Sequence, residues 1–416
     1  MSFSDQERIS HAARRLGLGV EPTILAEARS TDEAVVMATD LSIPTPQPDN
    51  LVVPEGLDEA KSMAQREAPF RYWLPQMIGG PRRIEERLTW FWHDHFATSV
   101  KKVRASYLMF VQHLTIRQHA TGNFADLLYA IATDPAMLVY LDGNKNRANE
   151  LNENFGREVM EIFTLGIGNY TEDDVLAATA AFSGWTIARP GRTSPSGAGP
   201  GEATFIENFH DATTHTFLGV TRSHDAGSAV DAILEQPATA EFIASKLHRE
   251  LVGLMPTPAA LTRIAGAFRR DYSIMALVSA IIEEEAFWSD EAVRAKVRTP
   301  LERLIGLVQV FGLALEGRPA VEIVRWLERL GFAPFNPPNV AGFPAGHRLL
   351  GPYHLVHGFD LATLLPEVPD WSSSQELANR MGLFDLTPET VSVLEASSGT
   401  PLQGALVVNS PEYLTT

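Results

Sequence analysis

The stretch 82–99, RRIEERLTWFWHDHFATS, holds the densest mixture of large apolar and polar side chains in the chain. At about 100° of turn per residue, one helical face gathers Leu88, Phe91, Trp92 and His95. His93 falls almost opposite, so His93 and His95 are not predicted to share a metal ion on a continuous helix. His95, surrounded by aromatic side chains, is the better candidate, because a desolvated imidazole stays neutral at pH 7 and can act as a base or a ligand.

A second stretch, 149–170 (NELNENFGREVMEIFTLGIGNY), has the same character. Helical spacing predicts a core stripe made of Leu151, Phe155, Val159 and Ile162. Beside it, Asn154, Glu158 and Glu161 stack along one flank. Two ionised carboxylates one turn apart repel, so they are tolerated only if water, an Arg or Lys, or a metal cation offsets them, or if one keeps its proton. One interpretation is that Glu158 or Glu161 is an acid/base group or a ligand, which the resemblance described below favours; the alternative is an exposed flank with Glu161 in a surface ion pair.

Composition restricts the possible functions. The 416 residues are 45% hydrophobic and 20% charged, enough for one large or two medium domains. A formal charge of −17 argues against a nucleic-acid partner. There is no Cys, so any metal must be held by His, Asp, Glu or Asn. No run of about 18 apolar residues occurs, and Met1 to Val20 does not read as a signal peptide, so we expect no membrane association and a cytoplasmic location.

Helical patterns recur along the chain and long strands are nowhere indicated, which predicts an all-α fold. We expect a large multi-helix orthogonal bundle with long Pro/Gly-rich loops and at most a minor β hairpin. A single domain covering 1–416 is predicted, with a subdivision near 187–225 into helical parts 1–186 and 226–416. Residues 187–203 are expected to form a flexible surface loop or lid. Residues 335–346 (FNPPNVAGFPAG) are expected to form a rigid, shaped loop.

Other local patterns are weaker. Lys101, Lys102 and Arg104 form a basic group in an acidic protein. They are predicted to be solvated, and attraction of an anionic substrate into a nearby cleft is the alternative. His210 and Asp211 stand in a polar loop, where such a pair caps a turn or takes part in chemistry. No nucleotide P-loop, dinucleotide fingerprint, H-E-x-x-H motif or G-x-S-x-G elbow occurs.

Several runs resemble the bacterial family called domain of unknown function 1800: LTWFWHDHFATS (88–99), DPAMLVYLDGNKN (134–146), LNENFGREVMEIFTLGIGNYTEDDV (151–175), AFSGW (181–185), FHDATTHTFLG (209–219), PPNVAGFPAG (337–346) and NSPEYL (409–414). The resemblance extends over nearly the whole chain and implies no assigned activity. Many relatives look exported and occur beside a second family that resembles sulfatases, which implies a protein partner from a neighbouring gene. This chain departs by lacking an export signal, by Phe343 where relatives commonly have Trp, and by His215 where they commonly have Lys. The signature polar positions of the family fall on His93, His95, Asn152, Glu153, Asn154, Arg157, Glu158, Glu161, Glu172, His210 and Asp211.

Together, the residues and the resemblance predict an enzyme acting on an unidentified small molecule. Its site would lie between the helices 82–99 and 149–168, closed by the loops at His210 and Asn339. The predicted catalytic residues are His95, Asn154, Arg157, Glu158 and Glu161. The predicted ligands of one divalent ion are His95, Glu158, Glu161, His210 and Asp211. Hydrolysis and redox chemistry both stay open, the latter with non-haem iron or a haem; a divalent metal is expected rather than haem.

The alternative is a non-catalytic helical scaffold or interaction protein. In it, the same side chains would form a buried polar network, with Arg157 bridging carboxylates and His95 bonding Asn154.

Overall fold

The computed structural model describes residues 3–44, 63–188, 198–199, 201–313, 318–364, 371–397 and 401–416. In the first half of these ranges the α-helices are α1 (Asp5–Leu16), α2 (Pro22–Glu27), α3 (Thr31–Thr39), α4 (Met63–Gly79), α5 (Arg83–His95), α6 (Val100–Val103), α7 (Ser106–His119), α8 (Phe124–Ala132), α9 (Pro135–Tyr140), α10 (Asn154–Glu158) and α11 (Glu172–Ala181). Short 3-10 turns are η1 (Gly143–Lys145) and η3 (Glu207–Phe209), and η2 (Val159–Thr164) is a π-helix.

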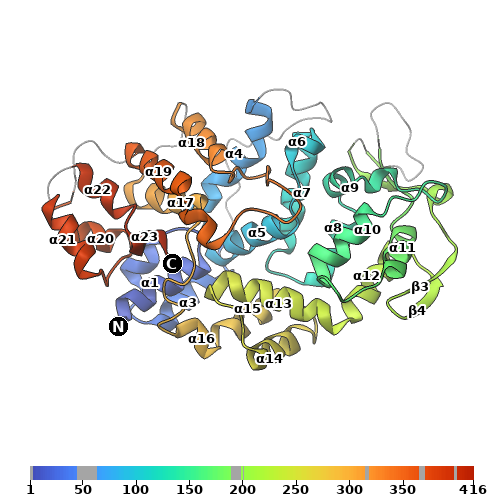
Figure 1. Ribbon diagram of the computed structural model, residues 1–416, viewed down its shortest axis with the longest axis horizontal. Coiled ribbons are helices and arrows are strands. Elements are labelled where there is room, and N and C mark those ends of the chain that lie inside the picture. Colours follow the sequence, from blue (N-terminus) through green and yellow to red (C-terminus); the bar gives the residue numbers. More distant parts are fainter. Residues whose placement is uncertain are drawn as a thin grey trace.

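In the second half the α-helices are α12 (Ala226–Glu235), α13 (Pro237–Val252), α14 (Pro258–Phe268), α15 (Ile274–Ile282), α16 (Glu285–Trp288), α17 (Pro300–Phe311), α18 (Arg318–Arg329), α19 (Pro352–Gly358), α20 (Ser374–Arg380), α21 (Pro388–Ala396), α22 (Pro401–Val407) and α23 (Pro411–Leu414). The 3-10 turns η4 (Gly346–Leu350) and η5 (Phe359–Leu364) flank α19. Figure 1 shows an elongated molecule, with α1 and α20–α23 at one end and α10–α12 at the other. Helices α5 and α13 lie in the middle and join the two ends.

Two small antiparallel sheets complete the described structure. Strand β1 (Trp185–Ile187) pairs with β2 (Ala203–Phe205), and β3 (Thr214–Phe217) pairs with β4 (Val220–Ser223). The second pair is a hairpin whose turn residues Leu218 and Gly219 both have positive φ, 47° and 85°, as a tight turn between twisted strands requires. The all-α prediction is confirmed, with two minor sheets. Most of the expected loop 187–203 lies outside the described residues, and its two ends are joined by the β1–β2 pairing.

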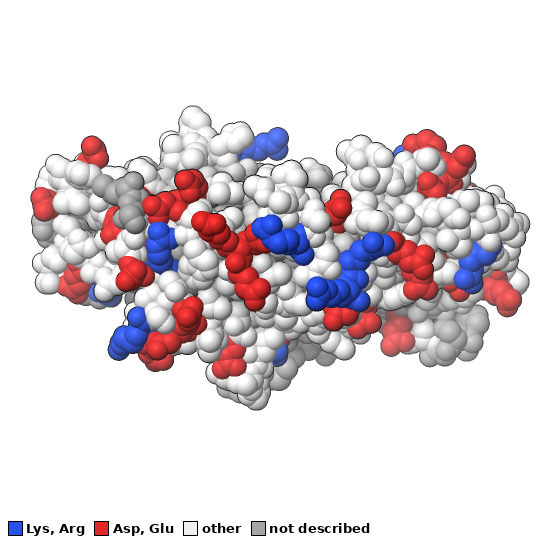
Figure 2. Space-filling view, turned by 90° about the horizontal axis from the view of Figure 1, so that it is seen from below, with Lys and Arg blue, Asp and Glu red and all other residues white. Residues whose placement is uncertain are grey.

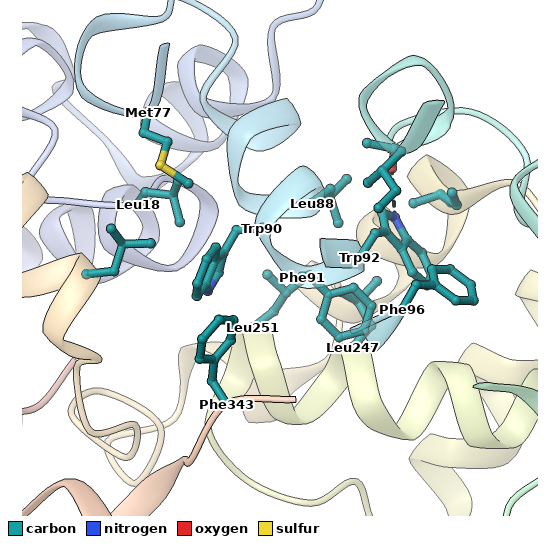
Figure 3. Close-up of a cluster of buried hydrophobic side chains, with 14 of the residues drawn as sticks. Leu18, Met77, Leu88, Trp90, Phe91, Trp92, Phe96, Leu247, Leu251 and Phe343 are labelled. Atoms are coloured by element: carbon teal, nitrogen blue, oxygen red, sulfur yellow. Dashed lines mark hydrogen bonds between the residues drawn. The ribbon is translucent and has the colours of Figure 1, made fainter. Parts of the chain in front are cut away.

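Helix α5 is the buried centre of the molecule. Its residues Ile84 to His93 are all buried, so it packs on every side rather than along one stripe. Figure 3 shows Trp90 facing Phe343, Phe91 pointing toward Leu247 and Leu251 of α13, and Trp92 on the other side of the helix. The rings of Trp90 and Phe343 stack with centroids 5.2 Å apart. The stretch 82–99 thus lies at the centre of the core. The sequence predicted one apolar face, whereas the helix is buried on every side.

The charged residues of α5 are tolerated in the core because each has partners. Glu86 accepts hydrogen bonds from the Trp73 indole at 2.8 Å and from Arg117. Arg87 donates to the carbonyls of Gly17 and Arg14 at 2.7 and 2.8 Å, and pairs with two carboxylates described below. A buried charge of this kind is stable only when paired and hydrogen-bonded.

The second stretch does not form the regular helix that the sequence predicts. Helix α10 begins only at Asn154 and continues as the π-helix η2, in which the Leu165 amide bonds the Met160 carbonyl at 2.8 Å. A π turn is wider than an α turn, so it displaces the side chains that follow. Phe155 and Val159 are buried as predicted, but Leu151 precedes the helix and is 43% exposed. The predicted stripe is therefore wrong at Leu151.

The surface agrees with the acidic composition. On the face drawn in Figure 2, acidic and basic side chains alternate in small groups and no broad basic area is visible. Across the described ranges, no helix combines the length and the apolar composition that a membrane crossing needs.

Candidate functional site

A cavity of about 240 Å³ opens beside His95, between α5, α13 and the loop 335–346. Its aromatic wall consists of Trp90, Phe91, Phe332 and Phe343. Its ionisable lining consists of Asp94, His95, Lys246, Arg249, Glu250 and Lys296. A concave, partly apolar pocket with a few converging polar groups is the usual form of a small-molecule site.

His95 is buried and uses both ring nitrogens. Its Nε2 lies 2.9 Å from the carbonyl oxygen of Phe163 at the end of η2, and its Nδ1 lies 2.8 Å from Lys246 Nζ. A carbonyl only accepts, so Nε2 carries the proton and Nδ1 accepts from the Lys246 ammonium. Burial, with the nearby Lys246 charge, holds the pKa of His95 well below its ordinary value. His95 is therefore a neutral acceptor that orients the Lys246 amine.

Two other groups of the cavity have pKa values near neutrality. Burial lowers the pKa of Lys246 to about 8, although the Asp94 carboxylate opposes this shift. Burial raises the pKa of Asp94 to about 6, and the Phe343 amide and the Lys246 charge oppose that shift. Paired groups whose pKa values are moved into the physiological range are typical of acid/base sites.

The loop 335–346 is fixed to α5 at two points. The Phe335 amide donates to His93 Nε2 at 3.0 Å, and the Phe343 amide donates to Asp94 Oδ1 at 2.7 Å. Burial lowers the pKa of His93 to about 3, so this imidazole stays neutral and available as an acceptor. The two histidines thus have different partners: His93 accepts a hydrogen bond from the loop, and His95 accepts one from Lys246. The loop is shaped, as predicted, and it forms one wall of the cavity.

Gly342 lets the loop approach Asp94. Its φ is 91°, and a Cβ there would lie 2.2 Å from Asp94 Oδ1. We expect Gly342→Ala to push the loop away from the cavity and to lower thermal stability and ligand binding there. Gly219→Ala is the matched control, because its φ of 85° carries a similar backbone cost while nothing lies within 4 Å of the added Cβ. Equal losses of melting temperature in the two variants would contradict this contact.

Glu250 and Lys296 line the cavity but belong to a buried ion network. Lys296 Nζ lies 2.5 Å from Glu250 and 2.9 Å from Glu302, and Arg87 pairs with the same two carboxylates. The pKa of Glu302 is held far below its ordinary value because the Lys296 and Arg87 charges outweigh its burial. Arg87, Glu250, Lys296 and Glu302 therefore form a network of ion pairs, and we infer that it stabilises the fold rather than taking part in chemistry.

The predicted catalytic carboxylates lie apart from this cavity lining. Burial, with the neighbouring Glu161 charge, raises the pKa of Glu158, as expected for two carboxylates on one flank. Glu161 accepts a hydrogen bond from the Tyr170 hydroxyl at 2.7 Å. Arg157 does bridge carboxylates, but they are the exposed Glu153 and Glu172.

The remaining predicted residues serve local structure. Asn154 donates to the Leu141 carbonyl at 3.1 Å and makes no hydrogen bond to His95 among those described, unlike the predicted network. His210 Nδ1 lies 3.2 Å from both Oγ and the carbonyl oxygen of Ser183, and the Asp211 amide donates to Ser183 Oγ at 2.8 Å. Asp211 also accepts from Thr213 and lies 3.4 Å from His215, so the pair caps a turn.

The predicted metal ligands are not assembled in this conformation. Among the residues that the structure describes, no three His, Asp or Glu side chains are placed to hold one ion. The cavity at His95 lies between α5 and α13, not between α5 and the 149–168 segment, and its lining includes the loop beyond Asn339 but not His210. The set His95, Glu158, Glu161, His210 and Asp211 therefore stays a prediction from the sequence.

Asp94 and Lys246 are the residues that the sequence analysis missed. Asp94 stands between the two histidines that attracted attention, and Lys246 is 151 positions from His95. One signal was available: the chain has only six lysines beside 28 arginines, and Lys246 stands three and four residues after the apolar Ile243 and Phe242, at helical spacing. A lysine beside apolar residues on one helical face is a candidate for a buried, functional amine.

Comparison with known proteins gives one match. The family model described as “Protein of unknown function (DUF1800)” matches residues 11–415, nearly the whole chain. No curated protein and no solved structure matches the chain.

Proposed function

Because the chain belongs to the DUF1800 family, whose function is unknown, the cavity itself has to suggest the activity, and we propose that it catalyses acid/base hydrolysis of a small molecule. The observation that carries the proposal is the Lys246 amine, bonded to His95 at 2.8 Å in a cavity that it shares with Asp94. Its pKa of about 8 and that of Asp94 of about 6 support complementary roles. At pH 7 Asp94 is mainly ionised and Lys246 mainly protonated.

The two groups can divide the proton transfers of hydrolysis. Asp94 takes a proton from a water molecule while the oxygen of that water attacks an acyl carbon of the substrate. Lys246 gives a proton to the departing oxygen or nitrogen, so the products are an acid and an alcohol or amine. The proton on Asp94 then returns to Lys246 through solvent. Water is the only co-reactant, and general acid/base catalysis of this kind contributes about 10²- to 10⁴-fold in rate.

Substrate size and polarity follow from the lining. A cavity of about 240 Å³ suits a small molecule, with its apolar part against Trp90 and Phe343. His95 is a positioning residue in this scheme, because it acts through Lys246. The cytoplasmic location and the neighbouring-gene partner stay predictions from the sequence.

Labelling of the intact protein tests the proposal first. A limiting amount of an amine-reactive reagent is applied between about pH 6 and 11.5, and each lysine is quantified by peptide mass spectrometry. We expect the reactivity of Lys246 to rise with a midpoint near pH 8, as its pKa of about 8 requires. A midpoint at the ordinary lysine value of about 10.4 would overturn the proposed role.

Substrate profiling tests the activity. Wild type and Lys246→Met are incubated with a metabolite extract, and compounds are followed by mass spectrometry. The proposal expects a compound that is hydrolysed by wild type and spared by the variant. An extract in which wild type consumes nothing faster than the variant contradicts it.

The scaffold alternative is favoured by one observation, the buried network of Arg87, Glu250, Glu302 and Lys296. This network differs from the predicted His, Glu, Arg and Asn cluster. It borders the cavity and could stabilise the fold without any catalytic role. Lysine labelling and substrate profiling distinguish the scaffold from the enzyme, since a scaffold requires neither a Lys246 that titrates near pH 8 nor a compound that is consumed.

A further inference from the structure

A second and larger cavity is lined by the first part of the loop 335–346, whose last part lines the His95 cavity. Its volume is about 810 Å³, within the range of sites that hold cofactor-sized ligands. Three segments far apart in sequence line it: 99–104, 139–145 and 328–338. Helices α6 and α9, which carry two of these segments, lie side by side (Figure 1). Asn336, Pro337 and Pro338 belong to the same loop that walls the His95 cavity.

The lining is basic, in contrast to the whole protein. Lys101, Lys102 and Lys145 line it together with two carboxylates, Asp142 and Glu328, in a chain whose formal charge is −17. Three of the six lysines of the chain therefore line one cavity. A cleft that gathers one sign of charge raises the local concentration of ligands of the opposite sign. Lysine ammonium groups are also common binders of phosphate.

Two of the cations pair with one carboxylate. Asp142 lies 2.9 Å from Lys102 and 2.6 Å from Lys145, so one carboxylate positions two ammonium groups. Lys102 also lies 5.5 Å above the Tyr140 ring. Within the described ranges, no carboxylate pairs with Lys101. The three lysines of the lining therefore outnumber its two carboxylates, Asp142 and Glu328.

Two wall residues adopt a backbone that side chains rarely take. Arg104 has φ 65° and Asp142 has φ 57°, both in the left-handed region without being glycine. Such residues persist where the surrounding structure imposes them, and they are frequent at ligand sites. In addition, Asn144 Oδ1 is buried and has no hydrogen-bond donor among the described residues. It offers a ligand one acceptor beside the basic groups.

We propose that this cavity binds a small organic anion with two or more negative charges. The ammonium groups of Lys101, Lys102 and Lys145 take the anionic end. Val139, Tyr140, Pro337 and Pro338 cover an apolar portion, and Asn144 accepts a hydrogen bond from a ligand hydroxyl or amine. Phosphate esters and polycarboxylates share this chemistry. The site does not depend on the proposed hydrolytic activity.

Titration calorimetry of the full-length protein at constant ionic strength tests the site. The probes are pyrophosphate, citrate and acetate. We expect saturable 1:1 binding of pyrophosphate or citrate, and the stronger of the two identifies the phosphate or the polycarboxylate source. Acetate binding as strongly as either, or no binding of any probe, overturns the proposal.

Variants locate the binding. Lys101→Met/Lys145→Met removes two exposed cations and should raise the dissociation constant at least about tenfold, since both charge-assisted hydrogen bonds to the anion are lost. Arg222→Met/Arg270→Met is the control for the same loss of two charges, because both arginines are exposed and lie outside both cavities. Circular dichroism confirms that each variant is folded. An equal loss of affinity in the control variant would show attraction by overall charge and would contradict a built site.

Lys246→Met should bind the anion as wild type does, so failure of the hydrolytic proposal leaves this one testable.

Discussion

Lys246→Met is expected to lower kcat/KM about 10²- to 10⁴-fold on the first substrate that is identified, the range that general acid catalysis contributes. Methionine keeps the length of the side chain but cannot donate a proton or bond His95 Nδ1. Asp94→Asn should cause a loss of similar size, because asparagine keeps an oxygen that can accept from the Phe343 amide but cannot act as a base. Asp94→Asn therefore removes the proposed base and keeps the hydrogen bond to the loop.

The pH dependence follows from the same two groups. Activity requires ionised Asp94 and should fall as the pH drops below about 6; it requires protonated Lys246 and should fall as the pH rises above about 8. The profile of kcat/KM should therefore be bell-shaped with a maximum near neutrality, and Asp94→Asn should lose the acid limb. Arg270→Met serves as the charge control. Wild-type turnover by Lys246→Met, with the fold intact by circular dichroism, would exclude Lys246 from the chemistry.

Arg87→Met is expected to destabilise the protein by about 3–5 kcal/mol, the usual cost of removing one partner from a buried ion pair. Arg87 is 1% exposed and contacts four acceptors: the carbonyls of Gly17 and Arg14, and the carboxylates of Glu250 and Glu302. Its loss leaves the buried Glu302 carboxylate with one ion-pair partner, Lys296, and the Thr299 amide. A shift of the urea midpoint, measured at pH 7, reports this change.

Arg157→Met provides the comparison, because Arg157 also pairs with two carboxylates, but at the surface. An exposed ion pair contributes little, since water and salt screen it and ordering its side chains costs entropy. We expect little change of the urea midpoint. If Arg157→Met destabilised the protein as much as Arg87→Met, the assignment of Arg157 to a surface pair would be wrong, and its predicted role in a buried polar network would be favoured.

The sequence was sufficient for the features that depend on local spacing. Apolar residues at helical intervals, interrupted by Pro and Gly, predicted an all-α fold, and the density of large side chains in 82–99 identified the central helix α5. The i, i+2 spacing of His93 and His95 predicted that they point to opposite sides of the helix, and the two imidazoles do bond different partners, the Phe335 amide and the Lys246 amine. Each of these conclusions follows from the geometry of one helix.

The tertiary structure decided which residues meet. A helical period shows which face is buried but not which distant element covers it, so Lys246 and the loop at Phe343 could not be assigned to His95 and Asp94 from spacing. The π-helix η2 also turns the side chains after Glu158 away from the directions that an α-helix would give them. The sequence did not predict this, because a single wider turn leaves no mark in the apolar pattern. The shifted pKa values of Asp94 and Lys246 arise from burial by three separate segments, and burial of that kind exists only once the chain has folded.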